Sequence, residues 1–120
     1  MIITLRELLS SDALTNLFIT LWAQLMGAPV YSKAISRATK KAIRAEIADM
    51  LDAAKDGYSS YDIDMNGVTD RVWESITSDE RTMLGDEYVI QDNLFAAFVR
   101  VREIIWCHHA VSAIDTEYIW

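Results

Sequence analysis

The spacing of apolar residues predicts helices along most of the chain. From Ala13 onward, large apolar residues recur at three- and four-residue steps, as on one face of an α-helix: Leu14, Leu17, Phe18, Leu21, Trp22 and Leu25. Gly27 and Pro29 end this helix. A capping box at Thr4–Glu7 predicts an earlier helix start, which Ser10–Asp12 interrupts or re-caps.

The middle of the chain predicts a long helix, a loop and two short helices. The long helix runs from Ser32 to about Lys55, and its larger apolar groups are Ile35, Ile43, Ile47, Met50 and Leu51. Residues 58–67 form the loop, because they are dense in Ser, Asp, Asn and Gly. Thr69 or Asp70 caps one short helix, and a capping box at Thr77–Glu80 opens another that Gly85 stops.

A last long helix is predicted from Asp86 to about Ala110. Its core line is Leu94, Phe98, Val101 and Ile105. The tail, residues 111–120, ends in apolar residues, so we expect it to dock on the body or on a partner. No alternating run is long enough to predict a sheet. The fold prediction is therefore a single all-α domain, residues 1–120, with four to five helices in a bundle.

Composition narrows the class of protein. The 120 residues are 52 % apolar and 24 % charged, an ordinary globular mixture that argues against long disorder. The single cysteine, Cys107, cannot form an internal disulfide, and the N-terminus does not read as a secretory signal, so we expect a cytoplasmic protein. The uncharged run Ala13–Ser32 contains polar residues and a proline, which argues against a membrane span.

The net charge of −7 conceals a strong division along the chain. Residues 1–45 carry two acids and six bases, whereas residues 46–120 carry sixteen acids and five bases. On the second predicted helix, five bases fall within one arc: Lys33, Arg37, Lys40, Lys41 and Arg44. This basic face either pairs with the acidic segment of the same chain or meets a partner of opposite charge.

Residues 62–67 (DIDMNG) match the first half of a calcium-binding loop. Asp62, Asp64 and Asn66 supply spaced oxygen ligands, and Asp70 stands at the ninth position. The bidentate Glu expected at the twelfth position is replaced by Trp73. The alternative is an Asx-turn loop that leads into a helix.

The sequence does not point to an enzyme or to a cofactor. Cys107, His108 and His109 are adjacent on a helix, so their side chains diverge and no base, nucleophile and orienting group can be placed together. The tryptophans, Trp22, Trp73, Trp106 and Trp120, fit core positions, and the acidic total argues against direct nucleic-acid binding.

The preferred hypothesis is a small interaction protein that uses its acidic segment. Carboxylates of this segment would occupy a partner's basic surface at sites meant for phosphates, and so inhibit nucleic-acid binding. In size, acidity and helix content the chain is similar to phage-encoded antirestriction and anti-CRISPR inhibitors, and that resemblance implies such an inhibitor. The carboxylates expected to bind are Asp62, Asp64, Asp70, Glu74, Asp79, Glu80, Asp86 and Glu87.

Two alternatives stay open. One is a homo-oligomeric helical scaffold or adaptor, in which the uncharged Ala13–Met26 helix forms a homodimer interface. The other is a calcium-dependent regulator that acts through the Asp62–Gly67 loop.

Overall fold

The computed structural model describes residues 10–27 and 35–117, with side chains up to residue 108. Within these ranges it holds five α-helices, one 3-10 turn and no strand, which confirms the predicted all-α class. The elements are α2 (Ser11–Leu25), α3 (Arg37–Lys55), η2 (the 3-10 turn Ser60–Asp62), α4 (Met65–Ser75), α5 (Ser78–Leu84) and α6 (Glu87–Glu117).

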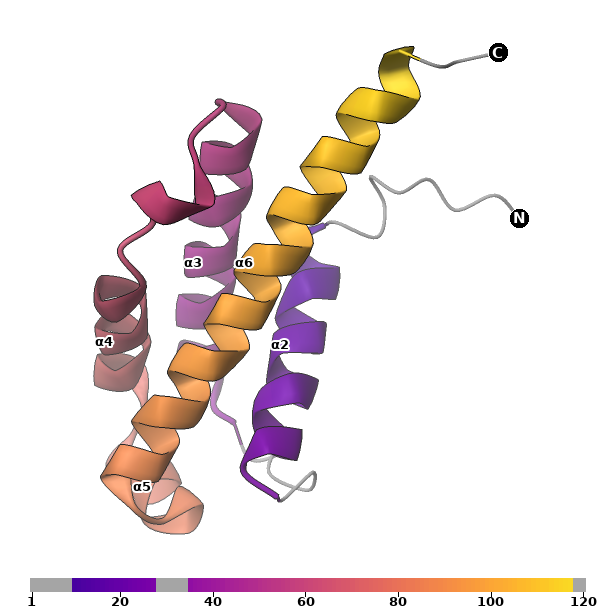
Figure 1. The fold of residues 1–120 in the computed structure, drawn as a ribbon. Helices are drawn as coiled ribbons and strands as arrows, with labels where there is room; N and C mark the ends of the chain where they lie inside the picture. Colours follow the sequence, from indigo (N-terminus) through magenta and orange to yellow (C-terminus); the bar gives the residue numbers. More distant parts are fainter. Residues whose placement is uncertain (1–9, 28–34, 118–120) are drawn as a thin grey trace.

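The long helix α6 crosses the other helices and contacts α2, α3 and α4 (Figure 1). Helix α3 lies between α2 and α4, and both of these neighbours run opposite to it. At a rise of about 1.5 Å per residue, α6 is about 46 Å long, whereas α2 and α3 are about 22 and 28 Å. The C-terminal end of α6 therefore projects beyond the rest of the bundle (Figure 1).

The core is built around the predicted line of α6. Leu94, Phe98, Val101 and Ile105 are all completely buried, as the spacing predicted. The ring of Phe98 lies 4.2 Å from that of Phe18, between ring centroids. Around this pair pack fully buried residues of α3 and α4: Ile43, Ile47, Met50 and Val72.

Several predicted helix ends are confirmed. Ser10 caps α2, because its hydroxyl accepts a hydrogen bond from the Ala13 amide at 3.1 Å. Gly27, just past α2, and Gly85, at the end of α5, have φ values of +71° and +98°, a conformation that glycine adopts without a Cβ penalty. The capping box at Thr77–Glu80 is present.

Other predicted ends were wrong. Helix α3 does not start at Ser32 but at Arg37, because the Ser36 hydroxyl accepts the Thr39 amide and makes Ser36 the N-cap. Helix α4 starts at Met65 and is capped by Asp64, so neither Thr69 nor Asp70 begins it.

Within α4, the Thr69 hydroxyl donates instead to the Met65 carbonyl. The loop predicted over residues 58–67 is correspondingly shorter and contains η2. Helix α6 continues to Glu117, past the predicted end at Ala110. The predicted Thr4–Glu7 start, Ser32 itself and the last three residues of the tail lie outside the described residues.

The apolar stripe predicted for α2 is only partly used in the core. Leu14, Phe18 and Trp22 are buried, whereas Leu17 and Leu25 are 37 % and 49 % exposed. The stripe is wider than the surface that α3 and α6 cover. One side of α2 therefore exposes leucine side chains to solvent.

None of the helices that the structure describes is both long enough and apolar enough to cross a membrane.

Replacing Phe98 tests the central position of α6. We expect Phe98→Ala to lower the free energy of unfolding by about 3–5 kcal/mol, because it removes a fully buried ring and leaves a cavity. Urea denaturation measures the loss. The control is Tyr61→Ala: Tyr61 is 89 % exposed, so its truncation should cost less than about 0.5 kcal/mol. Similar losses for the two variants would contradict this packing.

Candidate functional site

Eleven of the thirteen acids between residues 46 and 92 are exposed. They lie on the second half of α3, on η2, α4 and α5, and at the start of α6, which form the left and lower sides of the view in Figure 1. We call them the acidic surface: Asp49, Asp52, Asp56, Asp62, Asp64, Asp70, Glu74, Asp79, Asp86, Glu87 and Asp92.

No residue of the acidic surface forms an ion pair with any residue in the described ranges. Residues 46–92 also contain three basic residues, Lys55, Arg71 and Arg81, and the two arginines bind groups outside the acidic surface. Arg71 binds the buried Glu46, and Arg81 donates to the Trp73 carbonyl at 2.8 Å with its guanidinium 4.1 Å from the Trp73 ring centroid. Most of the negative charge of this surface is therefore left uncompensated.

Glu46 is one of the two acids that the fold uses internally. Its side chain is only 9 % exposed, and Arg71 of α4 donates to both of its oxygens, with Nη2 3.0 Å from Oε2. These hydrogen bonds from Arg71 to Glu46 raise the pKa of Arg71 against the cost of burial, and the charges of Asp64 and Asp49 add to the effect. The pair joins the acidic edge of α3 to α4.

Glu80 is the second buried acid, and its predicted role in partner binding was wrong. The residue is only 6 % exposed, so its carboxylate cannot reach a partner surface. Both oxygens lie within hydrogen-bond distance of the Thr39 hydroxyl, at 3.2 and 3.1 Å, and Oε1 accepts from the Thr77 hydroxyl at 3.1 Å. Burial follows from the capping box, which folds Glu80 back toward Thr77 and against α3.

The environment of Glu80 favours its charged form. Burial alone would raise its pKa, but hydrogen bonds from the side chain and backbone of Ser36 and from Thr77 outweigh that effect and hold the pKa below the ordinary value. Ser36 is the N-cap of α3 and Thr77 is the N-cap of α5. The carboxylate therefore lies at the positive ends of two helices.

The DIDMNG segment is used for helix capping. Oδ2 of Asp62 accepts from the Ser59 amide at 2.8 Å, and Oδ1 of Asp64 accepts from the Gly67 amide at 3.1 Å. A Cβ at position 67 would stand 2.7 Å from Oδ2 of Asp64, so the glycine allows the cap to approach closely. Asn66 and Asp70 lie within α4, exposed to solvent.

Among the residues that the structure describes, no group of three or more His, Cys, Asp or Glu side chains could hold a metal ion. Cys107 is exposed on α6.

The basic face of α3 does not pair with the acidic segment. Among the described residues, only Arg44 of this face forms an ion pair, and its partner is Asp12 of α2 at 3.0 Å. Arg37 and Lys41 are exposed and Lys40 is half-buried, while Lys33 lies outside the described residues. Between the described bases and acids, the intramolecular pairing that the sequence left open is absent, because Arg44 faces α2 whereas Glu46 faces α4.

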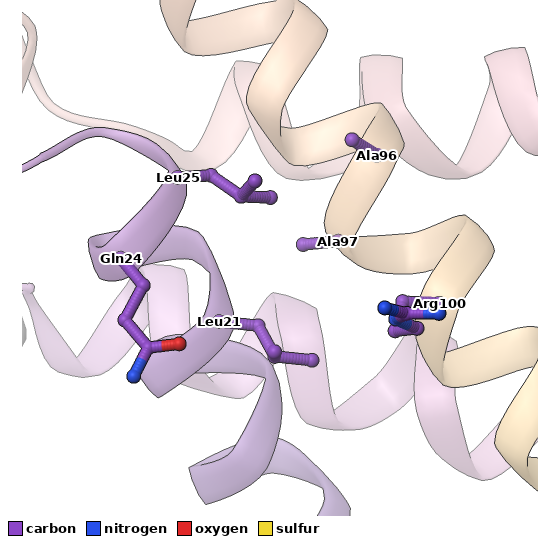
Figure 2. Close-up of a pocket in the computed structure, with 6 residues that line it drawn as sticks. All are labelled: Leu21, Gln24, Leu25, Ala96, Ala97 and Arg100. Carbon is purple, nitrogen blue, oxygen red and sulfur yellow. The ribbon is translucent and has the colours of Figure 1, made fainter.

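An apolar groove runs along the contact between α2 and α6, away from the acidic surface (Figure 2). Its volume is about 440 Å³, and Leu21 and Leu25 face Ala97 across it (Figure 2). The other lining residues are Gln24, Ala96 and Arg100. A second hollow of about 330 Å³ continues along α6 past Phe95, Val99 and Glu103. The sequence did not reveal this groove, because apolar spacing alone cannot show which leucines remain uncovered.

Comparison with models of known protein families, with curated proteins and with solved structures finds no match to this chain.

The buried carboxylate of Glu80 predicts a pH-dependent stability. Its folded-state pKa lies below that of the unfolded chain, so its stabilising effect is complete above about pH 4.3 and is lost as the pH falls through the folded value. We expect Glu80→Gln to lower the free energy of unfolding by about 1–3 kcal/mol at pH 7. The difference in the free energy of unfolding between Glu80→Gln and the native protein should then become smaller below pH 4.

Urea denaturation between pH 3 and pH 7 measures this difference. The matched control is Asp79→Asn at the neighbouring exposed acid, for which the loss should be smaller. A difference for Glu80→Gln that stays constant down to pH 3 would contradict the role of the charge.

Calcium should not stabilise the protein. Asp62 and Asp64 each commit an oxygen to a helix cap, and the strong twelfth ligand is missing. We expect the same melting temperature in millimolar calcium and in chelator, since a ligand that binds only the folded state must raise it. An upward shift that Asp64→Asn removes would restore the calcium hypothesis.

Proposed function

We propose that this chain is a small, non-enzymatic protein-binding module of the cytoplasm that inhibits a partner by covering its nucleic-acid-binding surface. The observation that supports this proposal is the acidic surface, with eleven exposed carboxylates and no ion pair to any described residue. Carboxylates on a helical scaffold attract the same lysine and arginine side chains that bind phosphates.

Seven predicted binding residues belong to the acidic surface, and the eighth, Glu80, is withdrawn because it is buried. Three of the seven have carboxylates held in place: the side chains of Asp62, Asp64 and Asp86 accept hydrogen bonds from main-chain amides. Because an amide is neutral, its hydrogen bond does not cancel the negative charge of the carboxylate. These carboxylates are therefore held in position before a partner binds, which lowers the entropic cost of binding.

The negative charge of the acidic surface would make the chain compete with nucleic acid for a basic partner. A surface of this kind would speed encounter with a basic partner, and its binding would weaken as salt rises. Small size, acidity and a helical fold are also the character of the phage-encoded antirestriction and anti-CRISPR inhibitors, and a bacterial nucleic-acid-binding protein is accordingly the partner class that we propose.

The test is capture from a bacterial lysate after enrichment on heparin, which retains proteins with basic, nucleic-acid-binding surfaces. The immobilised native chain should retain a partner that duplex DNA then displaces. The variant Asp70→Lys/Glu74→Lys/Asp79→Lys/Glu87→Lys should bind that partner at least about tenfold more weakly. None of these four residues caps a helix through its side chain in the structure.

The control variant is Arg37→Glu/Lys41→Glu, which alters exposed charges on the basic face only. It should bind the partner as well as the native chain does. Loss of binding in this control, with the four-site variant unaffected, would favour the basic face instead. A captured partner that resists duplex DNA would contradict the proposed competition with nucleic acid.

A further inference from the structure

The side of α6 that faces away from the core exposes large apolar residues between the charged residues Asp92, Arg100 and Glu103. Tyr88, Val89 and Phe95 are 77 %, 48 % and 39 % exposed, and Ala96 is exposed beside them. The buried line of Leu94, Phe98, Val101 and Ile105 occupies the opposite side. Exposed apolar residues that lie together mark a surface that a partner covers.

Helix α2 continues this surface without charge. Its exposed side carries Asn16, Leu17, Thr20, Gln24 and Leu25, in a protein in which 24 % of residues are charged. Depletion of charge around exposed apolar residues is typical of the centre of a protein interface. The two hollows along α2 and α6 share Ala96 and Arg100, so the surface is continuous, and we call it the α2–α6 face.

We propose that the α2–α6 face binds a second copy of this chain, with the two α6 helices antiparallel about a two-fold axis. The argument for a second copy is charge complementarity. Arg100 and Glu103 are the charged pair at the middle of this face, 67 % and 56 % exposed, and their contact within one chain is only a weak one at 3.8 Å. A two-fold axis between them places Arg100 of each copy opposite Glu103 of the other, and forms two ion pairs at once.

The length of α6 supports this axis. Arg100 and Glu103 lie on either side of its midpoint, since the helix runs from Glu87 to Glu117. Antiparallel copies would therefore overlap along the whole helix. The end of α6 that projects beyond α2 and α3 would lie along the first turns of α6 of the second copy (Figure 1). Among the described residues, this projecting end has no neighbouring helix within one chain (Figure 1).

The distribution of charge favours the same arrangement. Each copy carries a net charge of −7, and most of its acidic surface lies over α3, η2, α4 and α5. Two copies that met through that surface would repel one another. Contact through the uncharged side of α2 keeps the acids of α3, α4 and α5 away from the second copy, so this inference does not depend on the proposed function.

Paired charge reversals test the axis directly. The native chain should form a dimer in sedimentation equilibrium. Arg100→Glu alone and Glu103→Arg alone should each weaken it at least about tenfold, because like charges then face one another across the axis. An equimolar mixture of the two variants should associate as tightly as the native chain, since every cross-chain pair is then opposite. Asp52→Lys, on the acidic surface, is the control and should leave the dimer unchanged.

A second variant separates this face from any other. Ala96→Glu places a charge in the middle of the face at an exposed helix position, so it should dissociate the dimer while the circular dichroism melt stays that of a folded helical protein. A native chain that stays monomeric up to about 1 mM would overturn the proposal. So would a dimer that survives Ala96→Glu, or a mixture of reversed variants that associates no better than each variant alone.

Discussion

The buried carboxylate of Glu80 joins the start of α3 to the start of α5, beside the end of α4. It caps α5 through the Thr77–Glu80 box, and it reaches Ser36 and Thr39 at the start of α3. The Thr39 hydroxyl also lies 3.2 Å from the Ser75 carbonyl, at the end of α4. Glu80 thus satisfies polar groups at the starts of α3 and α5 in a buried place, and the Thr39 hydroxyl that it faces adds the contact with the end of α4. A buried charge is tolerable there because hydrogen bonds and two helix dipoles replace its hydration.

This arrangement explains an apparent fault in α3. The helix carries bases in its first half and acids in its second, an order that opposes its dipole, and its first turn contains no acid. Glu80 supplies the missing negative charge from another element. The bases and acids of α3 are thereby free to serve its two edges: Arg44 binds Asp12 of α2 and Glu46 binds Arg71 of α4. Helix α3 accordingly separates the uncharged side of the molecule from the acidic side.

Apolar spacing and capping motifs predict which segments are helical, but contacts between distant segments decide the roles of individual residues. The spacing of Leu94, Phe98, Val101 and Ile105 identified the core line of α6, and Thr77–Glu80 was recognised as a capping box. The start of α3 was misplaced because Ser32 and Ser36 are both good caps, and only contacts with the following turn distinguish them. The burial of Glu80 depends on Thr39, which is 41 residues away in the chain, and no local pattern encodes that distance.

The same reasoning explains why an acidic surface and an apolar face can coexist in so small a protein. The core needs one side of α2 and one side of α6, and the structure buries those sides completely at Phe18 and Phe98. Leu17 and Leu25 are not needed to fill the core of one chain, and both are partly exposed. Exposed leucines lower solubility, which the net charge of −7 partly offsets. Their apolar character is explained if the exposed side of α2 spends its time covered, while the acidic surface on the far side of α3 stays open to a partner of opposite charge.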